Sequence, residues 1–203
     1  MSLIKDATTY LDGIMNRPIL LWMTSRSRSS MISSIFAQHG IFWGDTQKQS
    51  AGYDTYENQN IKSLQKKIFK SLRGLDPIND NDPVNEFLKE LNKFVPQTRT
   101  WSMKTGVEFF NAFLPLNPYN IFITRKPEDI AQSLCNKRPG SNYDEALDVV
   151  HWRFDYMKEL QAEHGGVFVS TDKIIAGDFS EIKEAIEYCD LEYNEEAVKQ
   201  AIK

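Results

Sequence analysis

Residues 19–31 read ILLWMTSRSRSSM, and they carry the pattern of a buried strand, a polar loop and the start of a helix. An apolar run, Ile19–Met23, leads through a loop of hydroxyl and basic residues into a helical pattern. At such a junction the backbone N–H groups and the helix dipole favour an anion. Arg26 and Arg28 add positive charge, so the stretch predicts a phosphate site. A polar loop in which Ser29 only caps the helix is the alternative interpretation of the same residues.

Further apolar runs alternate with helical patterns along the chain. We expect strands at 101–104, 119–124 and 166–170 in addition to the first run. Helices are expected at 31–39, 58–73, 83–94, from 127 onward, at 143–163, and twice after 178. Asp82 is predicted to cap the helix that begins at Pro83, and 44–57 and 74–82 are predicted loops. This alternation predicts a three-layer α/β/α fold around a mostly parallel sheet.

The composition is that of an ordinary globular protein. With 203 residues, the chain is expected to form one domain over 1–203. Its 24 basic and 28 acidic residues argue against general binding to nucleic acid or anionic membranes, but allow a local basic pocket. No apolar run approaches the roughly 20 residues of a membrane span, and the N-terminal residues lack the apolar centre of a signal peptide. Cys135 and Cys189 have no metal-ligand spacing and fit a reducing compartment, so we predict a cytoplasmic location.

The phosphate loop resembles that of a known enzyme family. It lacks the glycines and lysine of the G-x-x-x-x-G-K-[ST] nucleotide loop. Arg26-Ser27-Arg28-Ser29-Ser30 is instead similar to the phosphosulfate loop of sulfotransferases that use 3′-phosphoadenosine 5′-phosphosulfate (PAPS). Arg28 stands where the commoner pattern of that family has glycine, which bears on how closely the backbone can wrap a phosphate.

A second motif strengthens the resemblance. The family pattern strand-R-x-P-x-x-x-x-x-S is matched by Arg125, Pro127 and Ser133 at the end of the run 119–124. An arginine is a bidentate ligand for phosphate, and a helix would place the serine about two turns along on the facing side. The resemblance covers roughly residues 18–190 and is closest to short microbial or phage-type members.

The resemblance implies a P-loop-like sulfotransferase fold and a reaction. PAPS would donate a sulfuryl group to a hydroxyl or amine acceptor by in-line displacement, leaving 3′-phosphoadenosine 5′-phosphate (PAP), with no metal. It implies that donor binding involves the following residues: Arg26, Ser27, Arg28, Ser29, Ser30, Arg125 and Ser133. Arg26 would neutralise the charge of the leaving phosphate. Lys104, at the end of its predicted strand, would stabilise the oxygens of the transferring sulfuryl group. A solvent-exposed strand end explains Lys104 equally well.

The general base is the least determined part of the site. The candidates are Asp45, Glu57 and Glu108, and each of them also fits an ordinary solvated surface acid. The sequence assigns no role to His39, which is expected to contact a helix C-terminus, to His151 on the long helix, or to His164 in a turn. Several residues fit either a site or ordinary packing: Arg138 beside the donor, and Trp43, Tyr53 and Tyr56 beside an acceptor.

Two other functions fit parts of the pattern. A P-loop kinase using ATP would need Mg²⁺ and an acid at a strand end, a position that only Asp172 approaches. A non-catalytic module that binds a nucleotide or glycan would keep the fold without a base. A glycan, a lipid, a peptide tyrosine and a small metabolite all remain open as acceptor.

Overall fold

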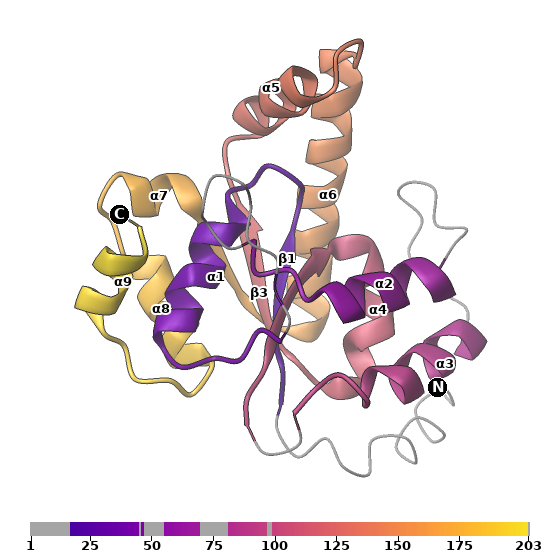
Figure 1. Cartoon of the computed structure of the whole chain (residues 1–203). Helices are drawn as coiled ribbons and strands as arrows, with labels where there is room; N and C mark the ends of the chain where they lie inside the picture. Colours follow the sequence, from indigo (N-terminus) through magenta and orange to yellow (C-terminus); the bar gives the residue numbers. More distant parts are fainter. Residues whose placement is uncertain (1–16, 45, 47–54, 70–80, 97–98, 203) are drawn as a thin grey trace.

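A four-stranded parallel sheet forms the centre of the protein (Figure 1). The computed structural model describes residues 17–44, 46, 55–69, 81–96 and 99–202. Its strands are β1 (Ile19–Met23), β2 (Ser102–Gly106), β3 (Tyr119–Thr124) and β4 (Val167–Ser170), in the order β2-β1-β3-β4. All three pairings are parallel, and they align Ile19 with Ser102 and Tyr119, and Ile121 with Val167. The predicted strands are therefore confirmed, with β2 shifted toward Gly106.

Both faces of the sheet are buried. Along β1, Ile19 and Leu21 belong to one apolar cluster, whereas Leu20 and Trp22 belong to another. Successive side chains of a strand point to opposite faces, so a strand covered on both sides is apolar throughout. The indole N–H of Trp22 donates to Asn120 Oδ1 at 2.9 Å, which pairs two polar groups inside the core.

Helices cover each face and complete the three predicted layers (Figure 1). One face packs against α1 (Ser29–Gln38), α7 (Thr171–Ile175), α8 (Ser180–Tyr188) and α9 (Glu195–Ala201). The other packs against α2 (Gln59–Ile68), α3 (Asn81–Leu91), α4 (Phe110–Phe113) and α6 (Tyr143–His164). Short 3₁₀ turns, η2 (Val107–Phe109) and η3 (Leu114–Leu116), flank α4. Helix α5 (Pro127–Lys137) packs on α6 beyond the carboxyl ends of the strands.

Helix boundaries confirm most of the prediction and correct two positions. Pro127 begins α5, and Gly40, with φ of 80°, follows the end of α1. Helix α3 begins at Asn81, so Asp82 lies in its first turn instead of capping it from a loop. His164 is the last residue of α6 and not part of a turn. Residues 70–80, with parts of the predicted helix 58–73 and loop 74–82, lie outside the described residues.

Within the described ranges, no helix is long and apolar enough to cross a membrane. The longest, α6, has 22 residues but carries acidic and basic side chains along its length.

Candidate functional site

The loop after β1 has an unusual backbone. Ser27 N donates to Thr24 O at 3.2 Å and closes a tight turn in which Arg26 has φ of 74°. Arg28 follows with φ of 61° and ψ of 27°, again in the left-handed region. This conformation favours glycine and costs other residues about 1–2 kcal/mol each. The loop therefore keeps, at Arg28, the kind of backbone that a glycine would adopt.

The N-terminus of α1 is open to a ligand. Arg28 is the N-cap residue and makes no side-chain capping bond, and the first turn holds no acidic residue. Ser29 is the first helical residue and is buried, with its carbonyl accepting from Ser33 Oγ at 3.0 Å. The interpretation of Ser29 as a simple cap is therefore wrong. Uncapped N–H groups at the positive end of a helix favour an anion.

A basic cavity of about 800 Å³ lies at the carboxyl edge of the sheet, in front of this loop. We define the basic cavity by the charged side chains that line it among the described residues: Arg26, Arg28, Glu57, Lys104, Arg125, Lys137 and Arg138. Ser29, Ser30 and Ser133 also line it. A chain of net charge −4 thus concentrates positive charge in one place. Such a cavity attracts anionic ligands.

The two sequence motifs meet in this cavity, although Arg26 and Arg125 lie 99 positions apart. Arg125 Nη1 donates to the carbonyl oxygen of Arg26 at 3.1 Å, and Arg26 Nε donates to Ser133 Oγ at 2.9 Å. The contact exists because β1 and β3 are neighbours and both end at the same edge. Having accepted this bond, the Ser133 hydroxyl can still donate its own proton to a phosphate.

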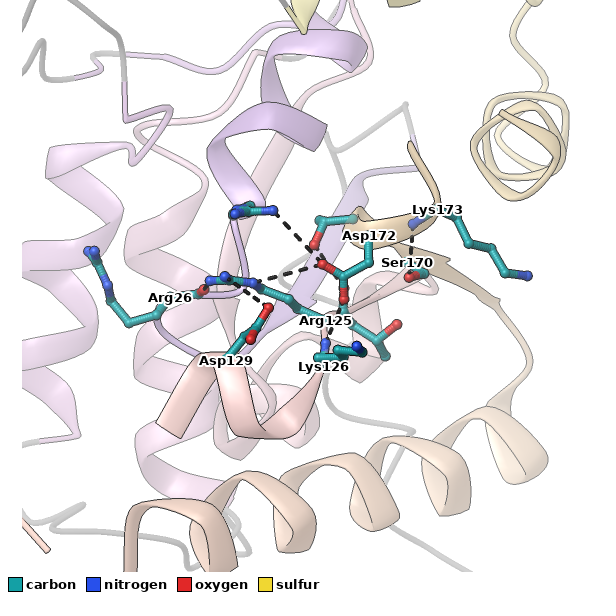
Figure 2. A network of polar contacts seen from close by, with 10 residues as sticks. Arg26, Arg125, Lys126, Asp129, Ser170, Asp172 and Lys173 are labelled. Carbon is teal, nitrogen blue, oxygen red and sulfur yellow. Dashed lines mark hydrogen bonds and ion pairs between the residues drawn. The ribbon is translucent and has the colours of Figure 1, made fainter. Parts of the chain in front are cut away.

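Asp172 lies close to both Arg28 and Arg125. Figure 2 shows it beside Arg125 and Lys126. Its Oδ1 is 3.9 Å from Arg28 Nη1 and 4.0 Å from Arg125 Nε, while its Oδ2 accepts from Lys126 N at 2.7 Å. Arg125 Nη2 also pairs with Asp129 Oδ2 at 3.3 Å. Both oxygens of Asp172 therefore face protein cations or a backbone N–H group, and the carboxylate links the first motif to the second.

Lys104 is buried instead of lying at a solvent-exposed strand end. It sits in the middle of β2, aligned with Leu21 of β1, and its side chain is only 3% exposed. Its Nζ donates to Ser30 Oγ at 2.8 Å and lies 3.9 Å from Glu57 Oε1. The ammonium group is thus held beside the first turn of α1, where it lines the basic cavity.

The three candidate bases are now distinguished by position. Glu57 lines the basic cavity beside Lys104, and its other oxygen, Oε2, accepts from Lys62 Nζ. Glu108 instead pairs with Arg153 at 3.3 Å and lines none of the cavities described here. Asp45 lies outside the described residues.

Other predicted site residues have different surroundings. Ser27 is fully buried and does not line the basic cavity, so its part in the loop is to shape the turn through its backbone. Trp43 packs against Tyr56 with ring centroids 5.5 Å apart, and Tyr53 lies outside the described residues. Arg138 lines the basic cavity, where it adds to the positive charge.

Two more cavities adjoin the basic cavity, and Ser25 lines all three. We call the first the side cavity: it has a volume of about 380 Å³, lies between α2 and β2, and shares Glu57 and Lys104 with the basic cavity. The second, of about 520 Å³, lies between α5 and α6 and shares Arg138. A molecule in the side cavity would therefore meet a molecule in the basic cavity beside Lys104.

The histidines and cysteines contribute no lining to these cavities. His39 Nδ1 lies 2.8 Å from Ile35 O, and its Nε2 accepts from Asn194 N at 3.3 Å, which is a structural role at the end of α1. Cys135 and Cys189 are free thiols, and burial raises the pKa of Cys189 to about 12. Among the residues that the structure describes, no three His, Cys, Asp or Glu side chains form a cluster that could hold a metal ion.

The fold is similar to that of a solved sulfotransferase. A scan against protein-family models and a search of curated proteins both find no match. The crystal structure of the sulfotransferase STF9 from Mycobacterium avium matches with a TM-score of 0.57 and 15% sequence identity. The match covers 98% of this chain and 70% of that chain. The chain therefore has a sulfotransferase-like α/β fold of the P-loop type.

Proposed function

We propose that this chain is a sulfotransferase of one domain that moves a sulfuryl group from PAPS to a hydroxyl acceptor. The observation that carries the proposal is the meeting of both motifs in one basic cavity, with Arg26 in contact with both Arg125 and Ser133. The likeness of the fold to a sulfotransferase supports it. A cytoplasmic location, as the sequence predicts, is part of the proposal.

The donor would lie along the basic cavity. Arg26, Arg28 and the N–H groups at the start of α1 would bind the 5′-phosphosulfate, with hydroxyl donors from Ser29 and Ser30. Arg125 and Ser133 would bind the 3′-phosphate. That phosphate would replace the exposed Asp129 as the partner of Arg125 Nη2.

Lys104 and Glu57 would act on the transferring group. The acceptor oxygen forms a new S–O bond as the S–O bond to the donor phosphate breaks, and the electron pair stays on that phosphate. Lys104 would stabilise the sulfuryl oxygens, and Arg26 the charge that develops on the leaving phosphate. Glu57, which is next to Lys104, would accept the proton of the acceptor hydroxyl.

The arrangement of Asp172 favours this reaction over ATP-dependent phosphoryl transfer. A P-loop kinase holds Mg²⁺ partly through a strand-end carboxylate. In this chain the corresponding carboxylate, that of Asp172, accepts a hydrogen bond from Lys126 N and lies close to Arg28 and Arg125. Protein cations would then balance the charge of the donor.

A binding and transfer experiment tests the proposal. PAP should raise the melting temperature far more than AMP, which lacks only the 3′-phosphate, because binding to the folded state stabilises it. Labelled sulfate should pass from PAPS to hydroxylated acceptors with and without EDTA. Arg26→Ala should lower kcat by about 10²–10³-fold. Arg26→Lys should recover part of this loss, since lysine keeps the charge but not the fork.

The matched control is Arg99→Ala, because Arg99 lies over the Phe42 ring and lines none of these cavities. Equal stabilisation by PAP and AMP would contradict the role of the second motif. Loss of transfer in EDTA would indicate a kinase-like, metal-dependent enzyme. Tight PAP binding with no transfer to any acceptor would indicate a non-catalytic module.

A further inference from the structure

The side cavity has two different walls. Phe69, Met103 and Phe109 supply apolar surface, whereas Lys62 and Lys66 of α2 supply positive charge. The lysines are four residues apart, which places them on the same side of the helix. Among the described residues, Lys62, Lys66 and Lys104 are the cations of the lining, and Glu57 is its anion.

The wall formed by α2 is fixed in place. Asn58 caps the helix by accepting from Asn60 N and Ile61 N, both at 3.1 Å. The buried Gln65 donates to Thr105 Oγ1 of β2 at 3.0 Å, which ties the helix to the sheet. The lysines therefore project from an anchored element beside the site of transfer.

Lys62 connects this charge to the proposed base. Its ammonium group donates to Glu57 Oε2, while Lys104 lies near Oε1 at 3.9 Å. An anionic group placed between Lys62 and Lys66 would compete with Glu57 for Lys62. Oε2 would then be available to accept the proton of a neighbouring hydroxyl.

We infer that the acceptor is a small amphipathic molecule whose anionic group binds Lys62 and Lys66 while its apolar part packs on Phe69 and Phe109. The inference rests on the proposed function, since it takes the side cavity as the acceptor site. A cavity of about 380 Å³ suits a ring-sized group.

Two probes of similar shape test whether the side cavity prefers an anionic group. They are 4-hydroxyphenylacetate and its neutral amide, 4-hydroxyphenylacetamide. Calorimetry measures their binding to the PAP-saturated protein, and labelled-sulfate transfer from PAPS measures turnover. We expect the carboxylate to be favoured about 10-fold, as charge-assisted hydrogen bonds at a partly exposed site allow. The preference should fall as salt is added.

The matched variants are Lys62→Gln, Lys66→Gln and, as control, Lys67→Gln on the same helix. Lys67 is exposed and does not line the side cavity. Lys62→Gln and Lys66→Gln should each reduce the preference for the carboxylate about fivefold, whereas Lys67→Gln should preserve it.

Three results would overturn this inference alone, provided that PAP still binds and sulfate is still transferred. They are equal binding of the two probes, failure of both probes to bind, and an equal effect of Lys66→Gln and Lys67→Gln. Failure of PAP to bind would overturn the proposed function itself.

Discussion

Replacing Lys104 by methionine should separate its effect on stability from its effect on catalysis. The methionine is close in length, so it can fill the space of a side chain that is 3% exposed. It removes the ammonium group that contacts Ser30 and approaches Glu57. Ser30 and Glu57 are not left as buried, unpaired charges, because Ser30 is neutral and Glu57 keeps its contact with Lys62.

The expected change in stability is small because two large terms oppose each other. At 3.9 Å, the attraction between Lys104 and Glu57 is about 4 kcal/mol at an effective dielectric constant of roughly 20. Burying an ammonium group costs several kcal/mol, which offsets this attraction. The free energy of unfolding should therefore change by less than about 1 kcal/mol. In contrast, kcat should fall by about 10²–10³-fold, the usual effect of removing a group that stabilises developing charge.

Urea unfolding measures the first quantity, and transfer of labelled sulfate measures the second. Lys67→Met is the matched control on an exposed position of α2 and should alter neither. If Lys104→Met keeps kcat within about threefold of the unmodified enzyme, the group stabilises no transition-state charge. If it loses more than about 3 kcal/mol of stability, the two opposing terms do not balance and Lys104 is a structural residue.

The loop, the second motif and the buried thiol each give a further prediction. Arg28→Gly should be more stable than Arg28→Ala by about 0.5–1 kcal/mol in thermal unfolding, since only glycine relieves the positive φ; an equal or reversed order would exclude strain. Arg125→Ala should weaken PAP binding in calorimetry by about 2–3 kcal/mol, and unchanged affinity would make Arg125 purely structural. The raised pKa of Cys189, about 12 against 9.0, means that its stabilisation is complete below pH 9 and is lost as pH rises toward 12. Urea unfolding should show the advantage over Cys189→Ala falling by about 1 kcal/mol between pH 9 and 10, and a constant difference would contradict this.

Local pattern was sufficient to predict the layers of this protein. Short apolar runs mark strands buried on both faces, and Pro127 and Gly40 mark helix ends for local reasons of backbone geometry. The Arg26–Ser30 loop and the arginine–serine motif can likewise be recognised, because each is a contiguous stretch at a strand–helix junction.

The contacts that make these motifs a site depend on the order of the strands. Arg26 meets Ser133 because β3 lies beside β1, an arrangement that spacing along the chain does not specify. The residue type at Arg28 does not indicate its left-handed backbone, since arginine rarely adopts it. The pointer is the glycine that the commoner sulfotransferase pattern has at this position.

The ion-pair partners of the acidic residues also cannot be predicted from the sequence. The sequence does not distinguish Glu57 from Glu108 as a candidate base. In the structure, Glu108 pairs with Arg153 of α6, whereas Glu57 lies beside Lys104. The fold class and the two motifs can be recognised from the sequence alone, because both arise from local pattern. The acid that faces the cavity and the burial of Lys104 can be known only from the folded structure. Both depend on side chains brought together from distant parts of the chain.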